Sequence, residues 1–123
     1  MGTNDWGYGA YEGETKLECF PAAYEEMLHA VTNTFPHAEV WCCTLCKAKA
    51  SAFPDFVFGE RAGDRPMIDY NTVIRTLCRK YGCKIIDLYR HGISYDSCDG
   101  IHPNASGMET LASLVIAEAE GNY

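Results

Sequence analysis

The chain has 123 residues, of which 47% are hydrophobic and 22% charged, a composition typical of one soluble globular domain over residues 1–123. Its formal net charge of −7 argues against a nucleic-acid partner, because phosphate binding depends on clustered lysine and arginine. No apolar run is long enough to cross a bilayer and no leader sequence opens the chain, so no membrane partner is expected.

The first part of the chain predicts a loop, a helix and a strand. Residues 2–19 are rich in glycine and polar side chains, which indicates a loop. Pro21 suits the first turn of a helix, and apolar residues recur after it at helical spacing up to Phe35-Pro36. These apolar residues are Tyr24, Met27, Leu28 and Val31. The nearly continuous apolar run 38–45 predicts a strand that is covered on both faces, as in a parallel sheet.

The middle of the chain repeats this pattern. Residues 47–66 contain two glycines and two prolines, so they predict a long loop. A helix is expected over 67–81, stopped by Gly82, and a second buried strand over 84–89. The residues on the inner face of that helix are Val73, Ile74, Leu77, Cys78 and Tyr81. Another loop is expected over 90–103.

The last helix begins near Asn104, which either caps it directly or yields to a capping box of Ser106 and Glu109. The residues expected on its inner face are Met108, Leu111, Ala112, Val115 and Ala119. Helices alternating with two buried strands indicate an α/β doubly wound fold with a parallel sheet. Two such strands leave open edges, so other strands or a second copy of the chain should complete the sheet, and a homodimer or higher homo-oligomer is expected.

Seven cysteines are present, at positions 19, 42, 43, 46, 78, 83 and 98. The odd count argues against a disulfide framework and for reduced thiols in a cytoplasmic protein. Cys43 and Cys46 have the spacing of a metal-binding pair, but no second pair recurs in the sequence. Neither a metal nor an organic cofactor is therefore expected.

Asp99 and His102 stand three residues apart in a loop directly before a helix. A carboxylate that accepts a hydrogen bond from the Nδ1–H of a histidine fixes the tautomer and leaves Nε2 free to act as a base. Pro103 pushes His102 toward an extended conformation. A surface loop in which both side chains are only solvated is the alternative interpretation.

Two short motifs, Gly2-Thr3-Asn4-Asp5 and Asp99-Gly100-Ile101-His102, lie near the two ends of the chain. They resemble the third motif, Gly-x-Asn-Asp, and the fifth motif, Asp-x-x-His, of the SGNH hydrolases, the GDSL-type lipases and esterases. The resemblance covers essentially the whole chain. It implies a flavodoxin-like three-layer fold and hydrolysis of small acyl or carbohydrate esters. It also implies that the chain is the carboxy-terminal portion of such a domain, with the N-terminal strands missing.

The resemblance assigns roles to individual residues. Asn4 would donate its side-chain amide to the tetrahedral intermediate, His102 would be the general base, and Asp99 would orient it. Gly2 and Asp5 would lie at the substrate cleft. Trp6 and Tyr8 would either line that cleft or cover the end of the sheet. A turn stabilised by hydrogen bonds from side chains to the backbone is the alternative for the Asn4-Asp5 pair.

The family's nucleophile motif, Gly-Asp-Ser, does not occur in the sequence. The nearest match, Gly63-Asp64-Arg65, has arginine in place of serine and follows Asn4 instead of preceding it. Ser94, Ser97 and Cys98 lie on the same short segment as His102 and Ser51 lies in the long loop, so none of them suits the role of nucleophile.

The chain is therefore predicted to be a poor or inactive esterase by itself. A start chosen too far downstream and a degenerate remnant that serves as an oligomeric interaction protein remain alternatives. A small ligand-binding module of the same fold is a third, with only fold analogy behind it.

Overall fold

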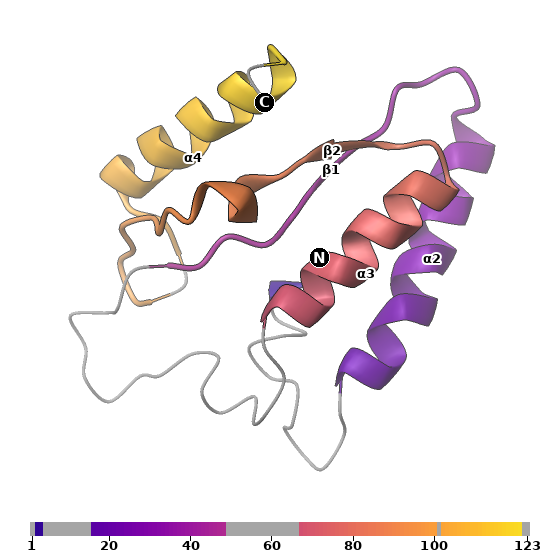
Figure 1. Ribbon diagram of the computed structural model, residues 1–123, viewed down its shortest axis with the longest axis horizontal. Coiled ribbons are helices and arrows are strands. Elements are labelled where there is room, and N and C mark those ends of the chain that lie inside the picture. Colours follow the sequence, from indigo (N-terminus) through magenta and orange to yellow (C-terminus); the bar gives the residue numbers. More distant parts are fainter. Residues whose placement is uncertain (1, 4–15, 49–66, 101, 122–123) are drawn as a thin grey trace.

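The computed structural model describes residues 2–3, 16–48, 67–100 and 102–121 of the chain. Its main elements alternate between helices and strands (Figure 1). They are α2 (Lys16–Thr34), β1 (Trp41–Cys43), α3 (Met67–Lys80), β2 (Lys84–Ile86), the 3-10 helix η2 (Leu88–His91) and α4 (Ala105–Ala119). None of the helices in these ranges has the length and apolar character needed to cross a membrane.

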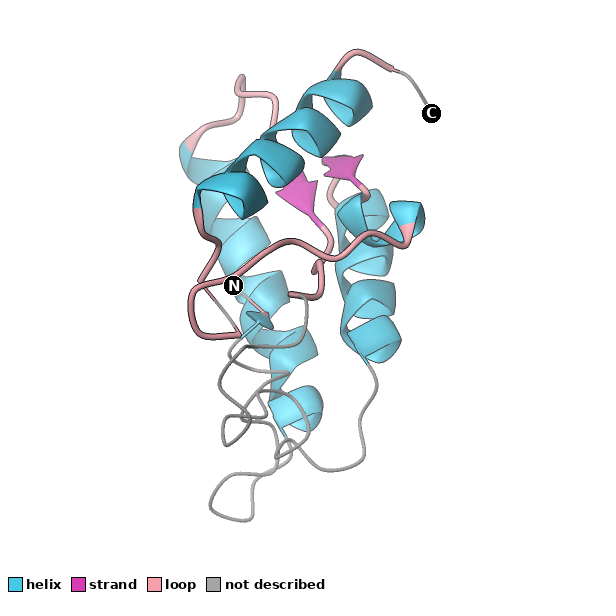
Figure 2. Cartoon of the chain, turned by 90° about the vertical axis from the view of Figure 1, so that its left-hand side faces the viewer, coloured by secondary structure: helices cyan, strands magenta, loops and turns pink. Residues whose placement is uncertain are grey.

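The two strands form a parallel pair, with Trp41 opposite Lys84 and Cys43 opposite Ile86. The prediction of a parallel sheet is thus confirmed. Helices α2 and α3 pack together on one face of the sheet, and α4 covers the other face (Figures 1 and 2). This is the expected three-layer α/β arrangement, with two strands in the described part of the chain. Strand β2 is shorter than its apolar run because the chain turns into η2 directly after Asp87, and β1 is shorter because it pairs with β2 only over Trp41–Cys43.

Helix α2 begins at Lys16, five residues earlier than predicted, so Pro21 lies inside the helix and not in its first turn. A proline at this place removes one backbone hydrogen bond of the helix. Aromatic packing next to it compensates. The ring of Phe20, which is 1% exposed, lies 5.3 Å from that of Tyr24 and 5.2 Å from that of Tyr70.

Helix α3 matches its prediction closely. It ends at Lys80, and Gly82 follows in the left-handed conformation with φ of 67°, which favours glycine. The residues that it buries are Met67, Tyr70, Asn71, Ile74, Leu77 and Cys78. The amide of Asn71 is fully buried. Its Oδ1 accepts a hydrogen bond from the backbone N–H of Leu45 at 2.6 Å and its Nδ2 donates to the carbonyl of the same residue at 3.3 Å. Asn71 therefore fixes the chain where it leaves β1.

Helix α4 is rotated relative to its prediction. Met108 is 56% exposed, and Ala112 and Ala119 are exposed as well, so these three residues do not face the sheet. The residues that α4 buries are Gly107, Leu114 and Glu118, with Leu111 and Val115 partly buried beside them. The prediction missed this face because it includes a glutamate, Glu118.

Glu118 can be buried because three groups satisfy its carboxylate. Arg90 donates to Oε1 at 2.6 Å, His91 contacts the same oxygen at 2.8 Å, and the backbone N–H of Asp87 donates to Oε2 at 3.2 Å. Buried carboxylates are tolerated when they are paired in this way. Glu118 therefore joins α4 to η2 and to the end of β2.

A second ion pair joins α3 to the end of the sheet and predicts a pH dependence. Burial alone would raise the pKa of Asp87, but hydrogen bonds from Arg75 at 2.7 Å and from Thr44 at 2.9 Å outweigh burial and hold that pKa below its usual value. A group whose pKa is lowered by folding stabilises the fold above its unfolded pKa, about 3.9 for aspartate, and loses that contribution as the pH falls. We expect the free energy of unfolding to decrease from pH 5 to pH 2. In Asp87→Asn that decrease should be smaller, although the variant is less stable at pH 7.

Urea titrations at several pH values measure this effect, with Glu26→Gln, an exposed position on α2, as the matched control. A decrease of the same size in Asp87→Asn and in the unsubstituted chain would show that Asp87 does not carry the acid sensitivity.

Candidate active site

The carboxylate of Asp99 holds His102 at two atoms. Its Oδ2 lies 2.6 Å from Nδ1 of the imidazole, and its Oδ1 accepts a hydrogen bond from the backbone N–H of His102 at 2.8 Å. The side chains are 46% and 72% exposed, respectively. The contact predicted from the Asp-x-x-His spacing is therefore present. It is an accessible arrangement and not a buried ion pair.

This geometry determines what the imidazole can do. An ionised carboxylate only accepts hydrogen bonds, so in the neutral imidazole the proton must reside on Nδ1. Nε2 then keeps its lone pair and can accept a proton from a substrate or a nucleophile. The double contact with Asp99 also limits rotation of the ring.

The loop that carries Asp99 and His102 is held together by contacts between its two ends. The backbone N–H of Cys98 donates to the carbonyl of His102 at 2.8 Å, and Ser97 and Pro103 form an antiparallel bridge. Gly100 lies at the turn with φ of 92°, a backbone conformation that residues with a Cβ rarely adopt. These contacts bring Asp99 back toward His102.

The same loop is fixed to the first turn of α4 through Asp96. The carbonyl of Asp96 accepts a hydrogen bond from the N–H of Asn104 at 3.1 Å, and its side chain accepts one from Ser106 at 2.9 Å. Asn104 caps the helix, since its Oδ1 accepts a hydrogen bond from the N–H of Gly107 at 2.9 Å. Of the two capping alternatives, Asn104 is therefore the one observed. A Cβ placed on Gly107 would lie only 2.0 Å from the carbonyl oxygen of Asp96, so only glycine allows the loop to approach this closely.

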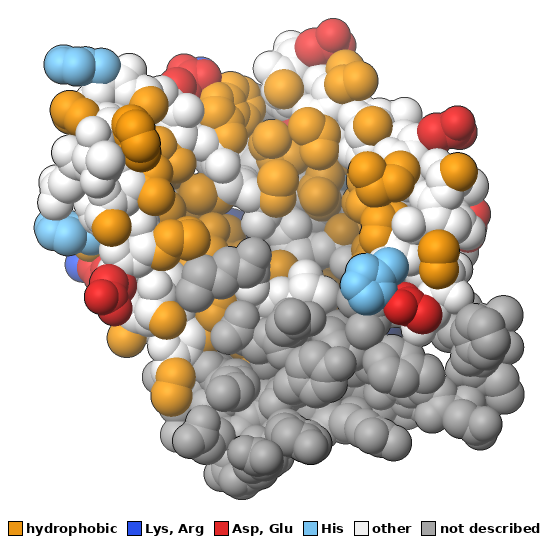
Figure 3. Space-filling model, turned by 180° about the vertical axis from the view of Figure 1, so that it is seen from behind, with side chains coloured by type: hydrophobic (Ala, Val, Ile, Leu, Met, Phe, Trp, Pro, Cys, Tyr) orange, Lys and Arg blue, Asp and Glu red, His pale blue; other side chains and the backbone are white. Residues whose placement is uncertain are grey.

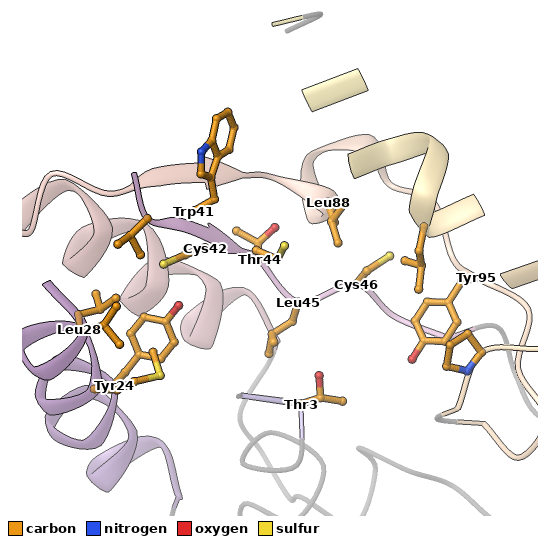
Figure 4. A pocket seen from close by; sticks show the side chains of 16 residues that line it. Thr3, Tyr24, Leu28, Trp41, Cys42, Thr44, Leu45, Cys46, Leu88 and Tyr95 are labelled. Carbon is orange, nitrogen blue, oxygen red and sulfur yellow. The ribbon is translucent and has the colours of Figure 1, made fainter. Parts of the chain in front are cut away.

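A groove of about 440 Å³ lies along β1, between α2 and the loop that precedes α4 (Figure 4). Thr3 lines the groove, and so does Pro103. These residues are the immediate neighbours of Asn4 and His102 in sequence. The groove is therefore lined by one residue of the first motif and by the residue that follows the second.

The structure places only some of the predicted site residues. Gly2 is buried with φ of 113°, and a Cβ there would lie 2.9 Å from the side chain of Leu45. The predicted residues Asn4, Asp5 and Trp6, together with Tyr8, lie outside the described residues. Most of the predicted loop 47–66 lies outside them too.

The hydroxyl and thiol groups near His102 have other surroundings. The hydroxyl of Ser97 accepts a hydrogen bond from the N–H of Gly100 at 2.9 Å, and Cys98 is exposed. Within the groove, burial raises the pKa of Cys46, so this thiol stays protonated near neutral pH. Among the described residues, none of these groups forms a hydrogen bond with the imidazole of His102, whose ring contacts Asp99.

Cys42 is the one groove residue for which a lowered thiol pKa is found in the described part of the chain. A hydrogen bond from Cys78 is the main cause and lowers the pKa to about 6 against the opposing effect of burial. Figure 4 shows Cys42 beside Tyr24 at one end of the groove, whereas Tyr95, on the segment that precedes Asp99, lies at the other end. Cys42 thus belongs to the core between α2 and α3.

No cluster of three or more histidine, cysteine or acidic side chains suited to a metal ion occurs among the residues that the structure describes. The thiol of Cys46 donates a hydrogen bond to the carbonyl of Ile93 at 3.1 Å, whereas Cys43 is exposed. The two thiols therefore lie in different environments.

Sequence reasoning missed Asp96 and Gly107 as supports of the Asp99–His102 loop. Their separation of eleven positions matches no motif, and a glycine in the first turn of a helix gives no signal of its own.

A family model described as the GDSL-like Lipase/Acylhydrolase family matches residues 1–110 of the chain. Comparisons with curated proteins and with solved structures gave no match.

Proposed function

The chain belongs to the GDSL-like lipase/acylhydrolase family, and from this premise we propose that it carries the proton-transfer half of a serine esterase site. The double contact between Asp99 and His102 supports the proposal most directly. His102 is the general base, Asp99 is the carboxylate that orients it, and Asn4 is the oxyanion donor that the family motif implies. The substrate class is a small acyl or carbohydrate ester.

The reaction that this arrangement suits is acyl transfer to a serine hydroxyl. Nε2 of His102 accepts the proton of that hydroxyl while its oxygen attacks the ester carbonyl, and Asp99 stabilises the imidazolium that forms. The imidazolium then donates the proton to the departing alkoxide. A second cycle, with water in place of the serine, releases the acid. One oxyanion donor such as Asn4 lowers a barrier of this kind by about 3–4 kcal/mol.

The 123 residues contain no Gly-Asp-Ser, and this limits what the chain does alone. Loss of the nucleophile lowers turnover about 10⁶-fold in a hydrolase of this type. The base, its carboxylate partner and the oxyanion donor do not compensate for a loss of turnover of this size. The chain by itself is therefore proposed to be inactive or nearly so toward esters.

A gain of activity tests the proposal. The chain and a fusion that joins the Gly-Asp-Ser-containing amino-terminal segment of a family member ahead of residue 2 are assayed with p-nitrophenyl acetate. The fusion should hydrolyse the ester and should be inactivated by an organophosphate, whereas the chain should stay at the rate of free imidazole. Equal rates for both would contradict the proposal, because activity would then not depend on the missing serine.

A measurement on the chain itself covers the case in which the fusion does not fold. Nitrogen-15 chemical shifts of the imidazole should report the Nδ1–H tautomer for His102 and should lose this bias in Asp99→Ala. His37, which is exposed, provides the internal reference. An equal mixture of tautomers at His102 would remove the basis for its role as a base.

We also propose, as a second function, that the chain acts without catalysis as a homo-oligomeric interaction protein in the cytoplasm. Exposed apolar side chains on α4 favour it, since Met108 and Ile116 are 56% and 55% exposed and lie on the same side of the helix. Gel filtration with light scattering at micromolar concentration should give twice 13.7 kDa, and Met108→Lys with Ile116→Lys should give 13.7 kDa. A monomer before substitution would exclude this function.

A further inference from the structure

The core between α2 and α3 contains three thiols that the candidate active site does not use. Cys42 comes from β1, Cys78 from the buried face of α3, and Cys83 directly precedes β2. Cys78 is fully buried, Cys42 is 7% exposed, and Cys83 is partly buried. The fold therefore gathers free thiols from three segments into one cluster.

The end of α3 brings Cys83 back to Cys78. The N–H of Gly82 donates to the carbonyl of Arg79 at 3.3 Å, and the N–H of Cys83 donates to the carbonyl of Cys78 at 2.9 Å. This pair of hydrogen bonds is the Schellman motif, which returns the residue after the left-handed glycine to the helix residue five positions earlier. Two thiols that lie five residues apart are therefore neighbours.

Three hydrogen bonds converge on the sulfur of Cys42. The donors are the thiol of Cys78, the hydroxyl of Tyr24 and the thiol of Cys83, and Figure 4 shows Tyr24 beside Cys42. The bond from Cys78 is the largest effect, and together the three lower the pKa of Cys42 to about 6 although burial opposes them. The same bond and burial raise the pKa of Cys78, so this thiol stays protonated at neutral pH. A thiolate therefore lies in direct contact with a thiol.

A thiolate beside a thiol has the two parts that disulfide formation needs. The thiolate is the form of cysteine that reacts with peroxides, and the sulfenic acid that results condenses with a thiol within reach. Cys78 is the thiol bound most strongly to Cys42, and it joins a different element of the fold. The cluster is also separate from the Asp99–His102 loop, because Cys83 precedes β2 whereas that loop follows η2.

We propose that Cys42 and Cys78 form a redox-active pair, which a hydroperoxide converts to a disulfide that ties α3 to β1. The thiolate sulfur of Cys42 attacks one peroxide oxygen, the O–O bond breaks, and the departing alkoxide takes a proton from water. The sulfur of Cys78 then attacks the sulfenic acid, and its proton leaves with the hydroxyl group as water. The two sulfurs together lose the two electrons that the peroxide gains.

The surroundings of the cluster suit a small, uncharged oxidant. Leu28 and Val31 line the groove together with Cys42, and Figure 3 shows hydrophobic side chains gathered in a hollow between two raised parts of the surface. Cys83 lines a separate hollow of about 280 Å³, between the turn after α2 and the turn that joins α3 to β2. A hydroperoxide can reach the cluster from this side, whereas a charged disulfide would lose its hydration there.

A map of the linkage in the unsubstituted chain tests the proposal. The reduced chain at low micromolar concentration is treated with one equivalent of hydrogen peroxide at pH 6, and catalase stops the reaction. At this pH about half of Cys42 is ionised, against about 0.3% of a thiol with the ordinary pKa of about 8.5. After alkylation with N-ethylmaleimide and digestion, mass spectrometry should find Cys42 joined to Cys78 as the main disulfide, and dithiothreitol should remove it.

Cys78→Ser separates the two steps. Serine keeps a hydrogen-bond donor for Cys42 but forms no disulfide, so the sulfenic acid should persist at Cys42. Dimedone, which reacts with sulfenic acids, should then label Cys42 at least tenfold more than in the unsubstituted chain. Cys19→Ser removes an exposed thiol of α2 and is the matched control. It should form the Cys42–Cys78 linkage at a rate within twofold of the unsubstituted chain.

Three results would each overturn the proposal. They are a main linkage of Cys42 to Cys83 or to any other thiol, oxidation of the exposed Cys19 ahead of Cys42, and the absence of dimedone from Cys42 in folded Cys78→Ser. The first two are measured on the unsubstituted chain, so the test holds even if Cys78→Ser does not fold.

Discussion

Replacing His102 by alanine in the fusion that carries Gly-Asp-Ser should lower kcat about 10⁶-fold, because the serine and its base act as one unit. The pair is defined by the 2.6 Å contact between Asp99 and Nδ1 of the imidazole. Initial rates with p-nitrophenyl acetate, corrected for the fusion that lacks its serine, measure the effect. Asp99→Asn should reduce kcat less, by about 10⁴-fold, since the base is kept but its tautomer is no longer fixed.

His37→Ala is the matched control for these substitutions, because this histidine is exposed in the turn before β1. It should leave kcat unchanged. If His102→Ala kept more than a hundredth of the activity, another base would have to serve the reaction, and the assignment of His102 would be wrong.

Gly107→Ala should destabilise the chain by about 3 kcal/mol, a large effect for the addition of one methyl group. The new Cβ would lie 2.0 Å from the carbonyl oxygen of Asp96, which is backbone and cannot turn aside. Alanine is a better helix former than glycine by about 1 kcal/mol, so the observed loss is the clash less this gain. Urea unfolding followed by circular dichroism measures the free energy change.

The same substitution should also disturb the site. A shift of Asp96 would displace its hydrogen bond with Asn104 and would therefore also shift the loop that holds Asp99 and His102. We therefore expect the Nδ1–H tautomer signal of His102 to weaken in Gly107→Ala, at urea concentrations where the variant is still folded. Ser113→Ala, at an exposed position of α4, is the control and should change stability by less than about 0.5 kcal/mol. A stability of Gly107→Ala equal to that of the control would show that the loop is not held at this point.

The elements that sequence predicted well are those in which one local signal decides the outcome. Gly82 ends α3 because the position needs a positive φ, and the Asp99–His102 contact forms because three residues of loop suffice to bring the two side chains together. Both are short-range effects. The parallel pairing of the strands also followed from a local property, the apolar character of residues on both faces.

The predictions that failed required knowledge of distant partners. Pro21 marks a helix start by local preference, yet α2 extends before it because Phe20 packs against Tyr70 of α3. On α4, the buried face could not be found from apolar residues alone, because the donors that satisfy Glu118 come from η2 and the end of β2. The close approach of Gly107 to Asp96 is likewise a tertiary contact that no periodicity shows.

Helices α3 and α4 are held to the rest of the fold by different numbers of buried residues. Helix α3 buries six residues, whereas α4 buries Gly107, Leu114 and Glu118. Sub-global opening in proteins begins where the least apolar surface holds a unit in place, so α4 should detach as a foldon before α3 separates from the sheet. His102 lies in the loop that is hydrogen-bonded to the first turn of α4, so in the fusion that carries Gly-Asp-Ser the loss of activity on heating should precede melting of the core.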